Sequence, residues 1–252
     1  LCIYKTENMS LLEAKTIVNN FYPQRVPKFQ QKVNYNPKYD LMIIVPVYNT
    51  ETFLNECIQS IINQKTKYLY KVIFIDDGST DQSSNILEDY RENRKVKIIH
   101  QQNIGIAGAR NEALKNICAK YILFVDSDDL LADNAIEVLM DAAYEKNADI
   151  VEGEHIEFGD VKPTKSKSKK IHISGYPWGK VILSEKLLNL CFPESYQYED
   201  TIISALLIPS CKEVHIIPNI VYYYRKNVNS VTAKLCNKKE SIDTLYMTFY
   251  CF

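Results

Sequence analysis

No Cys-x-x-Cys pair occurs in the 252-residue chain, although it contains seven cysteines. The cysteines are scattered and odd in number, and Cys57 and Cys118 fall on the apolar faces of predicted helices. A thiol in such a place behaves as a small hydrophobic group. Neither a disulfide framework nor a zinc site is therefore expected. The pattern fits a reducing, cytoplasmic environment.

An excess of charge and long apolar runs are also missing. The formal net charge is −1, which gives no general affinity for nucleic acid. The apolar runs are much shorter than the roughly 20 residues that cross a bilayer. No apolar signal segment follows Leu1, and because the chain begins with leucine we expect a segment of a longer protein.

Strands and helices alternate between about residues 40 and 157. This alternation predicts an α/β fold, with a mostly parallel sheet flanked by helices. Short apolar runs predict strands, and apolar residues at helical spacing predict helices. The predicted strands are 41–47, 72–75, 96–99, 121–125, 149–154 and 214–217, and the predicted helices are 9–22, 54–62, 105–118, 136–143, 180–190, 200–208 and 242–249.

Polar clusters follow three of the predicted strands. Tyr48 and Asn49 follow the first, Asp77 follows the second, and Asp126-Ser-Asp-Asp129 follows the strand at 121–125. Ligands of open parallel sheets bind beyond the carboxyl ends of the strands. Crowded carboxylates repel one another, and a divalent cation that also binds phosphate relieves this repulsion. The sequence therefore predicts a metal and phosphate site. Asp129, taken by itself, could instead be a helix cap.

Four ordered motifs resemble the family 2 glycosyltransferases, which have the GT-A fold. They are Val45-Pro-Val-Tyr-Asn49, Asp76-Asp-Gly-Ser79, Gly105-Ile-Ala-Gly-Ala-Arg110-Asn111 and Phe124-Val-Asp-Ser-Asp-Asp129. The resemblance is close over residues 40–157 and looser over 175–232. It implies a nucleotide-sugar donor, usually a uridine diphosphate sugar, and a Mn²⁺ or Mg²⁺ ion held by Asp126 and Asp128. The donor-binding residues that it implies are Pro46, Val47, Tyr48, Asp77, Arg110, Asp126 and Arg225.

The second half resembles the acceptor side of the same family. Tyr198-Glu199-Asp200 resembles the motif whose aspartate is the general base of inverting members, since a carboxylate can take the proton of an attacking hydroxyl. Glu199 and Trp178 are assigned to the acceptor site. Structural alternatives remain at this stage: a helix N-terminus for Glu199-Asp200, a core position for Trp178, and ion pairs for Arg110 and Arg225.

The resemblance implies an inverting, metal-dependent transfer of a sugar to a hydroxyl of a glycan or lipid-linked acceptor, as in bacterial surface polysaccharide synthesis. A non-catalytic nucleotide- or glycan-binding domain is an alternative. A sugar nucleotidyltransferase is less favoured, because the loop after the first strand has neither glycine nor a cation. A dehydrogenase is disfavoured because no Gly-x-Gly-x-x-Gly follows that strand.

Five regions are expected along the chain. A helical extension (1–39) precedes a nucleotide-sugar-binding half (40–158), a basic flexible loop (159–174), an acceptor-side half (175–232) and a helix cut by the end of the chain (233–252). The lysine-rich stretch 162–170 is either a solvated loop or a contact to an anionic acceptor or membrane headgroups. The expected location is the cytoplasm, at the inner face of the membrane if the acceptor is lipid-linked.

Overall fold

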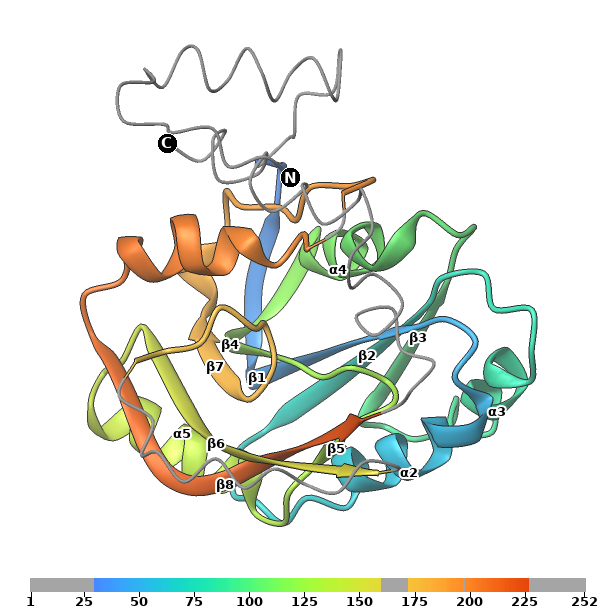
Figure 1. Ribbon diagram of the computed structural model, residues 1–252, viewed down its shortest axis with the longest axis horizontal. Coiled ribbons are helices and arrows are strands. Elements are labelled where there is room, and N and C mark those ends of the chain that lie inside the picture. The colour runs from blue at the N-terminus through green and yellow to red at the C-terminus, as the bar shows by residue number, and fades with distance from the viewer. Residues whose placement is uncertain (1–29, 160–171, 197, 227–252) are drawn as a thin grey trace, which may run out of the picture.

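A mixed eight-stranded sheet lies at the centre of the described chain (Figure 1). The computed structural model describes residues 30–159, 172–196 and 198–226. The strand order is β3-β2-β1-β4-β7-β6-β8-β5, and the first four strands in this order are parallel. The bounds are β1 Asn34–Val47, β2 Tyr70–Asp76, β3 Val96–His100, β4 Asn116–Phe124, β5 Leu130–Leu131, β6 Ile150–Gly159, β7 Lys180–Leu183 and β8 Val214–Lys226.

Helices cover both faces of the sheet, as the alternation of elements predicts (Figure 1). Leu41 and Ile43 of β1 face the core under α2 and α5, whereas Met42 and Ile44 face the core under α4. A strand buried on both faces is an unbroken apolar run, which is why β1 is recognisable from sequence. The helices are α2 Glu51–Ile62, α3 Ser83–Glu88, α4 Gly105–Leu114 and α5 Ala135–Glu145, with short turns η1 Ser184–Leu187, η2 Ile203–Leu207 and η3 Ile208–Ser210.

The strand order reverses beside β1. The chain runs from β1 to β2 and β3 on one side and then returns to β4 on the other side. The pairing of β1 with β4 ends at Ile44 and Phe124, and the carbonyl of Ile44 accepts from the N–H of Val125 at 3.0 Å. By strand alternation Pro46 also faces β4, so its missing N–H costs no ladder bond. A crevice of the kind that binds ligands in open α/β sheets therefore begins between the ends of β1 and β4.

The predicted helix at 180–190 is wrong. Lys180–Leu183 form β7, which is antiparallel to both β4 and β6. Val181 belongs to one core and Ile182 to the other, so the segment follows the twofold period of a strand. Partners far away in the sequence determine this strand, and only the short turn Ser184–Leu187 remains helical.

The predicted helix at 105–118 is too long. It ends at Leu114, and Ile117 and Cys118 belong to β4, which begins at Asn116 because it pairs there with Asn34 of β1. Strand β1 therefore includes residues 34–39, which were expected in the helical extension. The predicted helices at 9–22 and 242–249 and most of the basic loop lie outside the described residues.

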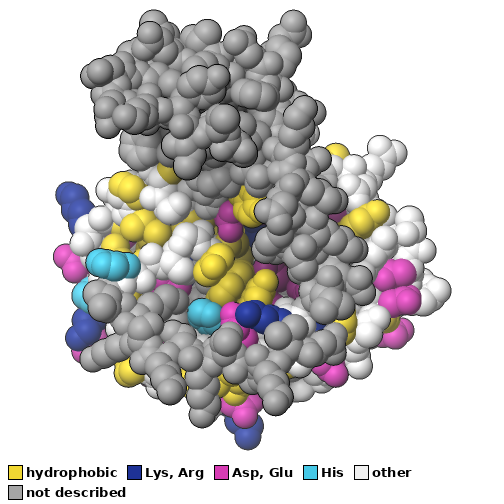
Figure 2. All heavy atoms as spheres, in the orientation of Figure 1, with side chains coloured by type: hydrophobic (Ala, Val, Ile, Leu, Met, Phe, Trp, Pro, Cys, Tyr) yellow, Lys and Arg dark blue, Asp and Glu magenta, His cyan; other side chains and the backbone are white. Residues whose placement is uncertain are grey.

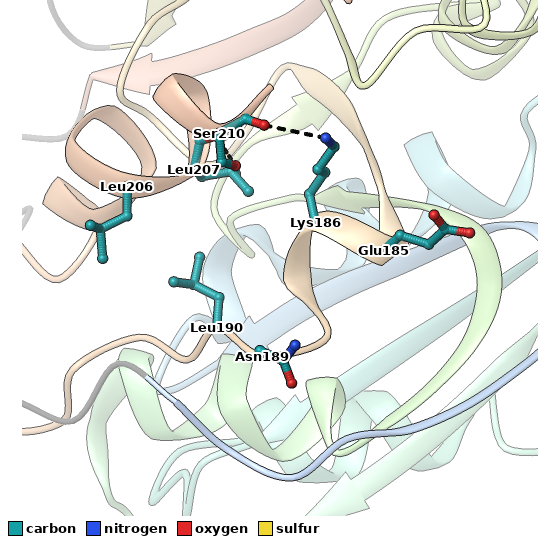
Figure 3. A pocket seen from close by; sticks show the side chains of 7 residues that line it. All are labelled: Glu185, Lys186, Asn189, Leu190, Leu206, Leu207 and Ser210. Carbon is teal, nitrogen blue, oxygen red and sulfur yellow. Dashed lines mark hydrogen bonds between the residues drawn. The ribbon is translucent and has the colours of Figure 1, made fainter. Parts of the chain in front are cut away.

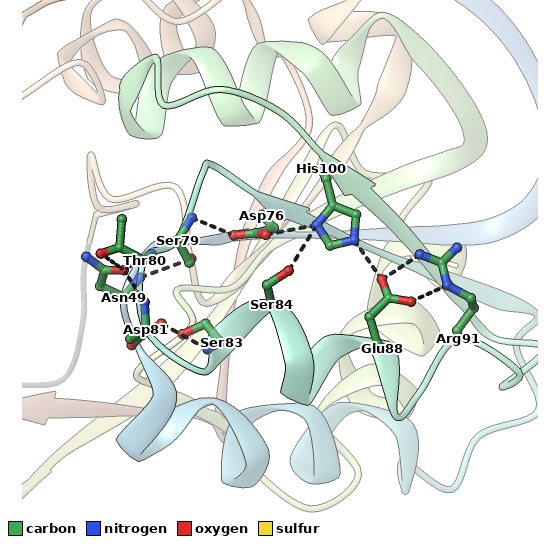
Figure 4. A network of polar contacts seen from close by, with 10 residues as sticks. All are labelled: Asn49, Asp76, Ser79, Thr80, Asp81, Ser83, Ser84, Glu88, Arg91 and His100. Atoms are coloured by element: carbon green, nitrogen blue, oxygen red, sulfur yellow. Dashed lines mark hydrogen bonds and ion pairs between the residues drawn. The ribbon is translucent and has the colours of Figure 1, made fainter.

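Asn49 joins the loop after β1 to the loop after β2 (Figure 4). Its side-chain carbonyl accepts from the N–H of Thr80 at 2.8 Å, and its own N–H donates to the hydroxyl of Ser79 at 3.2 Å. Its φ of 52° lies in the left-handed region, which asparagine adopts more readily than most residues. The two strand ends are therefore held together by side chains of the two motifs.

His100, at the end of β3, lies between two carboxylates (Figure 4). Its Nδ1 is 2.8 Å from Asp76 and its Nε2 is 2.7 Å from Glu88. Ionised carboxylates only accept hydrogen bonds, so both ring nitrogens donate when the ring is protonated. Partial burial opposes that charge, but the hydrogen bonds to Asp76 and Glu88 outweigh it and raise the pKa of His100 above its ordinary value of 6.5.

Replacement of His100 by asparagine should destabilise the fold in a pH-dependent manner. A raised pKa in the folded state contributes stability that is fully present below the unfolded value of 6.5 and is lost as the pH rises through the folded value. Since 38% of the side chain is exposed, solvent screening limits the effect to about 0.5–1 kcal/mol. Urea unfolding of both proteins across this pH range measures it.

His215→Asn is the matched control, because this side chain has a similar exposed fraction, 32%, and pairs with one carboxylate, Glu213. Its loss should give a smaller change over the same range. An unfolding free-energy difference for His100→Asn that does not vary with pH contradicts the assignment.

Candidate functional site

The aspartates after β4 form a tight turn at the crevice between β1 and β4. The N–H of Asp129 donates to the carbonyl of Asp126 at 3.1 Å, which closes the turn. Asp126 and Asp128 remain partly exposed, whereas Asp129 is buried. Two of the three carboxylates can therefore meet a ligand in the crevice.

Asp129 anchors the turn to β8, and the prediction that it caps a helix is wrong. Its carboxylate accepts from the hydroxyl of Tyr222 at 2.9 Å and from the N–H of Arg225 at 2.6 Å. The same Tyr222 oxygen accepts from the N–H of Asp126 at 3.0 Å. Sequence reasoning missed Tyr222, whose OH group holds both ends of the aspartate turn.

The turn has more negative charge than its surroundings neutralise. Burial, followed by the charge of Asp126, raises the pKa of Asp128 to about 6. Burial and the charges of Asp126 and Asp128 also raise the pKa of Asp129. Two partly exposed carboxylates with repelling charges fit a divalent cation chemically. No group of three or more His, Cys, Asp or Glu side chains among the described residues could hold a metal, but Mg²⁺ often needs only one or two carboxylates with substrate phosphates.

Arg225 of β8 is hydrogen-bonded to the aspartate turn. Its Nε donates to the carbonyl of Asp128 at 2.7 Å, and its Nη2 donates to Glu56 at 2.7 Å. The guanidinium lies 4.5 Å from the ring centre of Phe53 and 4.4 Å from that of Phe158. The structure thus gives Arg225 the ion pair considered from sequence. Its predicted contact with a diphosphate stays a prediction.

Arg110 of α4 joins the aspartate turn to the Glu199-Asp200 motif. The side chain is 2% exposed, its Nη1 donates to Glu199, and its Nη2 donates to Asp126 at 3.1 Å. Residues that are far apart in the sequence therefore meet at one guanidinium. This is the ion-pair role considered for Arg110, but inside the fold, with the nearly buried Glu199 and the partly exposed Asp126 as partners.

Asp200 has the properties of a candidate general base. Burial, followed by the charge of Glu199, raises its pKa to about 6, although Arg110 opposes the shift. A carboxylate with a pKa nearer the working pH is a better proton acceptor than an ordinary aspartate. Such shifts are frequent at functional sites, and structural ion-pair networks also produce them.

Asn111, the neighbour of Arg110, fixes the segment that leads into this motif. Its side-chain amide donates to the carbonyl of Phe192 at 2.8 Å and accepts from the N–H of Phe192 at 2.7 Å. Sequence reasoning quoted this residue within a motif but gave it no role. The pair Arg110-Asn111 therefore fixes the segment 192–199 at two points.

Trp178 is the centre of an aromatic cluster beside the turn. Its ring is nearly parallel to those of Tyr176, Tyr222 and Tyr224, with centroid distances of 4.8, 4.7 and 5.3 Å. Only 5% of Trp178 is exposed, whereas 49% of Tyr176 is exposed. The predicted acceptor contact of Trp178 stays a prediction, and Tyr176 is the aromatic residue of this cluster that is most open to solvent.

The predicted nucleotide pocket lies at the ends of β1 and β2. Val47 is buried and Tyr48 is exposed. The N–H of Asp77 donates to the carbonyl of Val47 at 2.8 Å. The buried carboxylate of Asp77 accepts from the N–H groups of Ile104 and Gly105 at 3.0 and 2.8 Å, so it satisfies the start of α4. The structure therefore gives Asp77 a structural role beside its predicted contact with the base.

Hydrophobic side chains gather at the centre of the face shown in Figure 2, next to acidic and basic ones.

A hollow of about 210 Å³ lies between η1 and the 203–210 helical segment (Figure 3). None of the predicted site residues lines it, and its Lys186 pairs with Asp149 at 3.2 Å. Within the described ranges, no helix is long and apolar enough to cross a membrane.

The model of the family "Glycosyl transferase family 2" matches residues 42–203. The chain is 30% identical over 214 residues to the uncharacterized glycosyltransferase EpsJ of Bacillus subtilis, covering 75% of this chain and 62% of EpsJ. It is also 30% identical over 206 residues to the minor teichoic acid biosynthesis protein GgaB of the same organism, covering 74% of this chain and 23% of GgaB. The chain thus spans less than two thirds of either relative.

Two solved structures show the same fold. S. aureus TarS 1–349 in complex with UDP-GlcNAc has a TM-score of 0.67 and 23% identity, covering 76% of this chain and 60% of that one. The mannosyltransferase PcManGT from Pyrobaculum calidifontis, in complex with GDP-Man and Mn²⁺, has a TM-score of 0.62 and 14% identity, covering 94% and 73%. The fold is that of a GT-A domain. The chain belongs to glycosyltransferase family 2.

Proposed function

We propose that the chain is the catalytic part of an inverting glycosyltransferase, which moves a sugar from a nucleotide-diphosphate donor to a hydroxyl of a glycan or lipid-linked acceptor. The observation that carries this proposal is the meeting of Asp126 and Glu199 at Arg110. This contact network links the aspartate turn to Glu199-Asp200, which supports a cation and a diphosphate at the turn and a base at Asp200.

The proposed reaction is a single displacement. Asp200 takes the proton of the acceptor hydroxyl while the hydroxyl oxygen bonds to the anomeric carbon of the donor sugar. The bond from that carbon to the nucleotide diphosphate breaks on the opposite side, so the configuration inverts. A divalent cation, Mn²⁺ or Mg²⁺, held by Asp126 and Asp128 would neutralise charge on the diphosphate.

The relatives support the donor and acceptor classes. The TarS structure contains UDP-GlcNAc, which supports a UDP-sugar, and the PcManGT structure contains Mn²⁺. GgaB is a teichoic acid biosynthesis protein, which supports a role in bacterial surface polysaccharide synthesis. A cytoplasmic enzyme with peripheral membrane contact is consistent with a lipid-linked acceptor.

Release of nucleotide diphosphate from a panel of UDP- and GDP-sugars tests the function. Turnover is expected with Mn²⁺ or Mg²⁺ and should stop with EDTA, because the paired charges of Asp126 and Asp128 need a cation to accept a diphosphate. Metal-independent turnover would refute the proposed site. Donor binding without turnover towards any glycan or lipid-linked acceptor would support the non-catalytic alternative instead.

Asp200→Asn should lower the turnover number by about 10²–10⁴-fold, because an amide cannot take the acceptor proton. Binding of UDP with Mn²⁺, measured by calorimetry, should change little. Asp133→Asn, at an exposed position, is a control that should leave both quantities unchanged. If Asp200→Asn loses UDP binding instead, Asp200 belongs to the nucleotide site.

The turnover number should rise with pH through about 6, the raised pKa of Asp200, and level off above it. The sign follows because the base must be ionised to accept a proton. The profile should be measured at saturating Mn²⁺ and donor, since Asp128 also has a pKa of about 6 without a bound cation. A rate that is flat or that falls across this range contradicts the role of Asp200.

A further inference from the structure

Arg110 is positioned differently from a residue that holds a nucleotide. Both terminal nitrogens of its guanidinium already donate to carboxylates, Nη1 to Glu199 and Nη2 to Asp126. Its Nε is buried and has no hydrogen-bond partner among the residues that the structure describes. With 2% of the side chain exposed, a phosphate could reach the guanidinium only by displacing one of these partners.

Two aromatic rings restrict movement of this guanidinium. Its carbon lies 5.2 Å from the ring centre of Phe192 and 6.0 Å from that of Phe124. Phe192 is itself fixed to Asn111 by two hydrogen bonds. A buried guanidinium that packs against fixed aromatic rings keeps its two carboxylate partners in one geometry.

Glu199 is the residue through which this geometry reaches Asp200. The preceding residue, Tyr198, has a φ of 57°, a left-handed conformation that is strained for a tyrosine. Such strain persists only where surrounding contacts impose it. The ion pair from Arg110 to Glu199 is a contact of this kind, because it fixes the side chain directly after Tyr198 and directly before Asp200.

We propose that Arg110 is a positioning residue that couples occupation of the donor site at Asp126 to the placement of the base Asp200. This inference rests on the proposed function. When a nucleotide and a cation bind at Asp126, the carboxylate of Asp126 interacts with the cation and therefore less strongly with Arg110. The guanidinium then interacts more strongly with Glu199 and holds the 198–200 turn. By linkage, ordering of that turn strengthens donor binding to the same extent.

Hydrogen–deuterium exchange tests the coupling without relying on turnover. UDP with Mn²⁺ should slow exchange of the backbone amides at 199–203 in the wild-type chain and should not slow it in Arg110→Met. UDP binding is followed in the same samples by the fluorescence of Trp178, the single tryptophan, whose stacked neighbour Tyr222 bonds to the N–H of Asp126. Unchanged exchange in the wild-type chain with UDP bound overturns the proposal.

Kinetics give a second test with Arg110→Lys, Arg110→Met, Glu199→Gln and the double variant Arg110→Met with Glu199→Gln. Each single change to Met or Gln should lower the turnover number by about 100-fold, as expected for a misplaced catalytic group. The KM for donor should rise by a smaller factor than the turnover number falls. Linkage weakens donor binding only by the free energy of ordering the turn, whereas the turnover number also reflects the misplaced base. The double variant should be no worse than the worse single variant, and the lysine variant should recover part of the rate.

Lys186→Met is the matched control, since it removes a partly buried cation paired with Asp149 outside the site. It should lower stability without changing the turnover number or the exchange at 199–203. The proposal is overturned if the Arg110 variants change donor affinity more than the turnover number. It is also overturned if the effects of the two single changes add in the double variant. If the Arg110 variants do not fold, an unchanged rate in Glu199→Gln overturns it. A wild-type chain that shows the coupling but transfers no sugar refutes the proposed function instead.

Discussion

Parallel hydrogen bonding of β1 with β2 and β4 is the constraint on which the site depends. Val47 is in register with Asp76, and Ile44 is in register with Phe124, so polar residues after three strands emerge at one edge. Close packing in two different cores favours this register, because a slip of one residue would exchange the side chains of the two cores. The reversal of strand order lies beside β1, which is where ligands bind in open α/β sheets.

Polar contacts from a single helix hold the segment 192–199 against the parallel half of the sheet. Arg110 and Asn111 occupy adjacent positions in α4, and they hold Glu199 and Phe192 respectively. Both are buried, so each lost partner would leave a desolvated polar group. The aspartate turn and the Glu199-Asp200 motif are consequently parts of one packed unit in the described chain.

The strands of the parallel half could be predicted because burial on both faces gives unbroken apolar runs, as in β1. Strand β7 could not, because its four residues are strand only between β4 and β6, which local sequence does not reveal. For the site, the motifs indicated the aspartate turn and Asp200. They did not indicate that Tyr222 and Arg225 hold that turn through Asp129, since such contacts depend on the fold of the second half.

The contacts of Tyr222 have a consequence for how the protein is made. Its hydroxyl and the N–H of Asp126 are 96 positions apart in the chain, and Asp129 bonds to the same strand. During synthesis the apolar strands of the first half therefore emerge long before the tyrosine that fixes the turn. The contacts that tie Asp126 and Asp129 to Tyr222 can therefore form only after β8 has been synthesised.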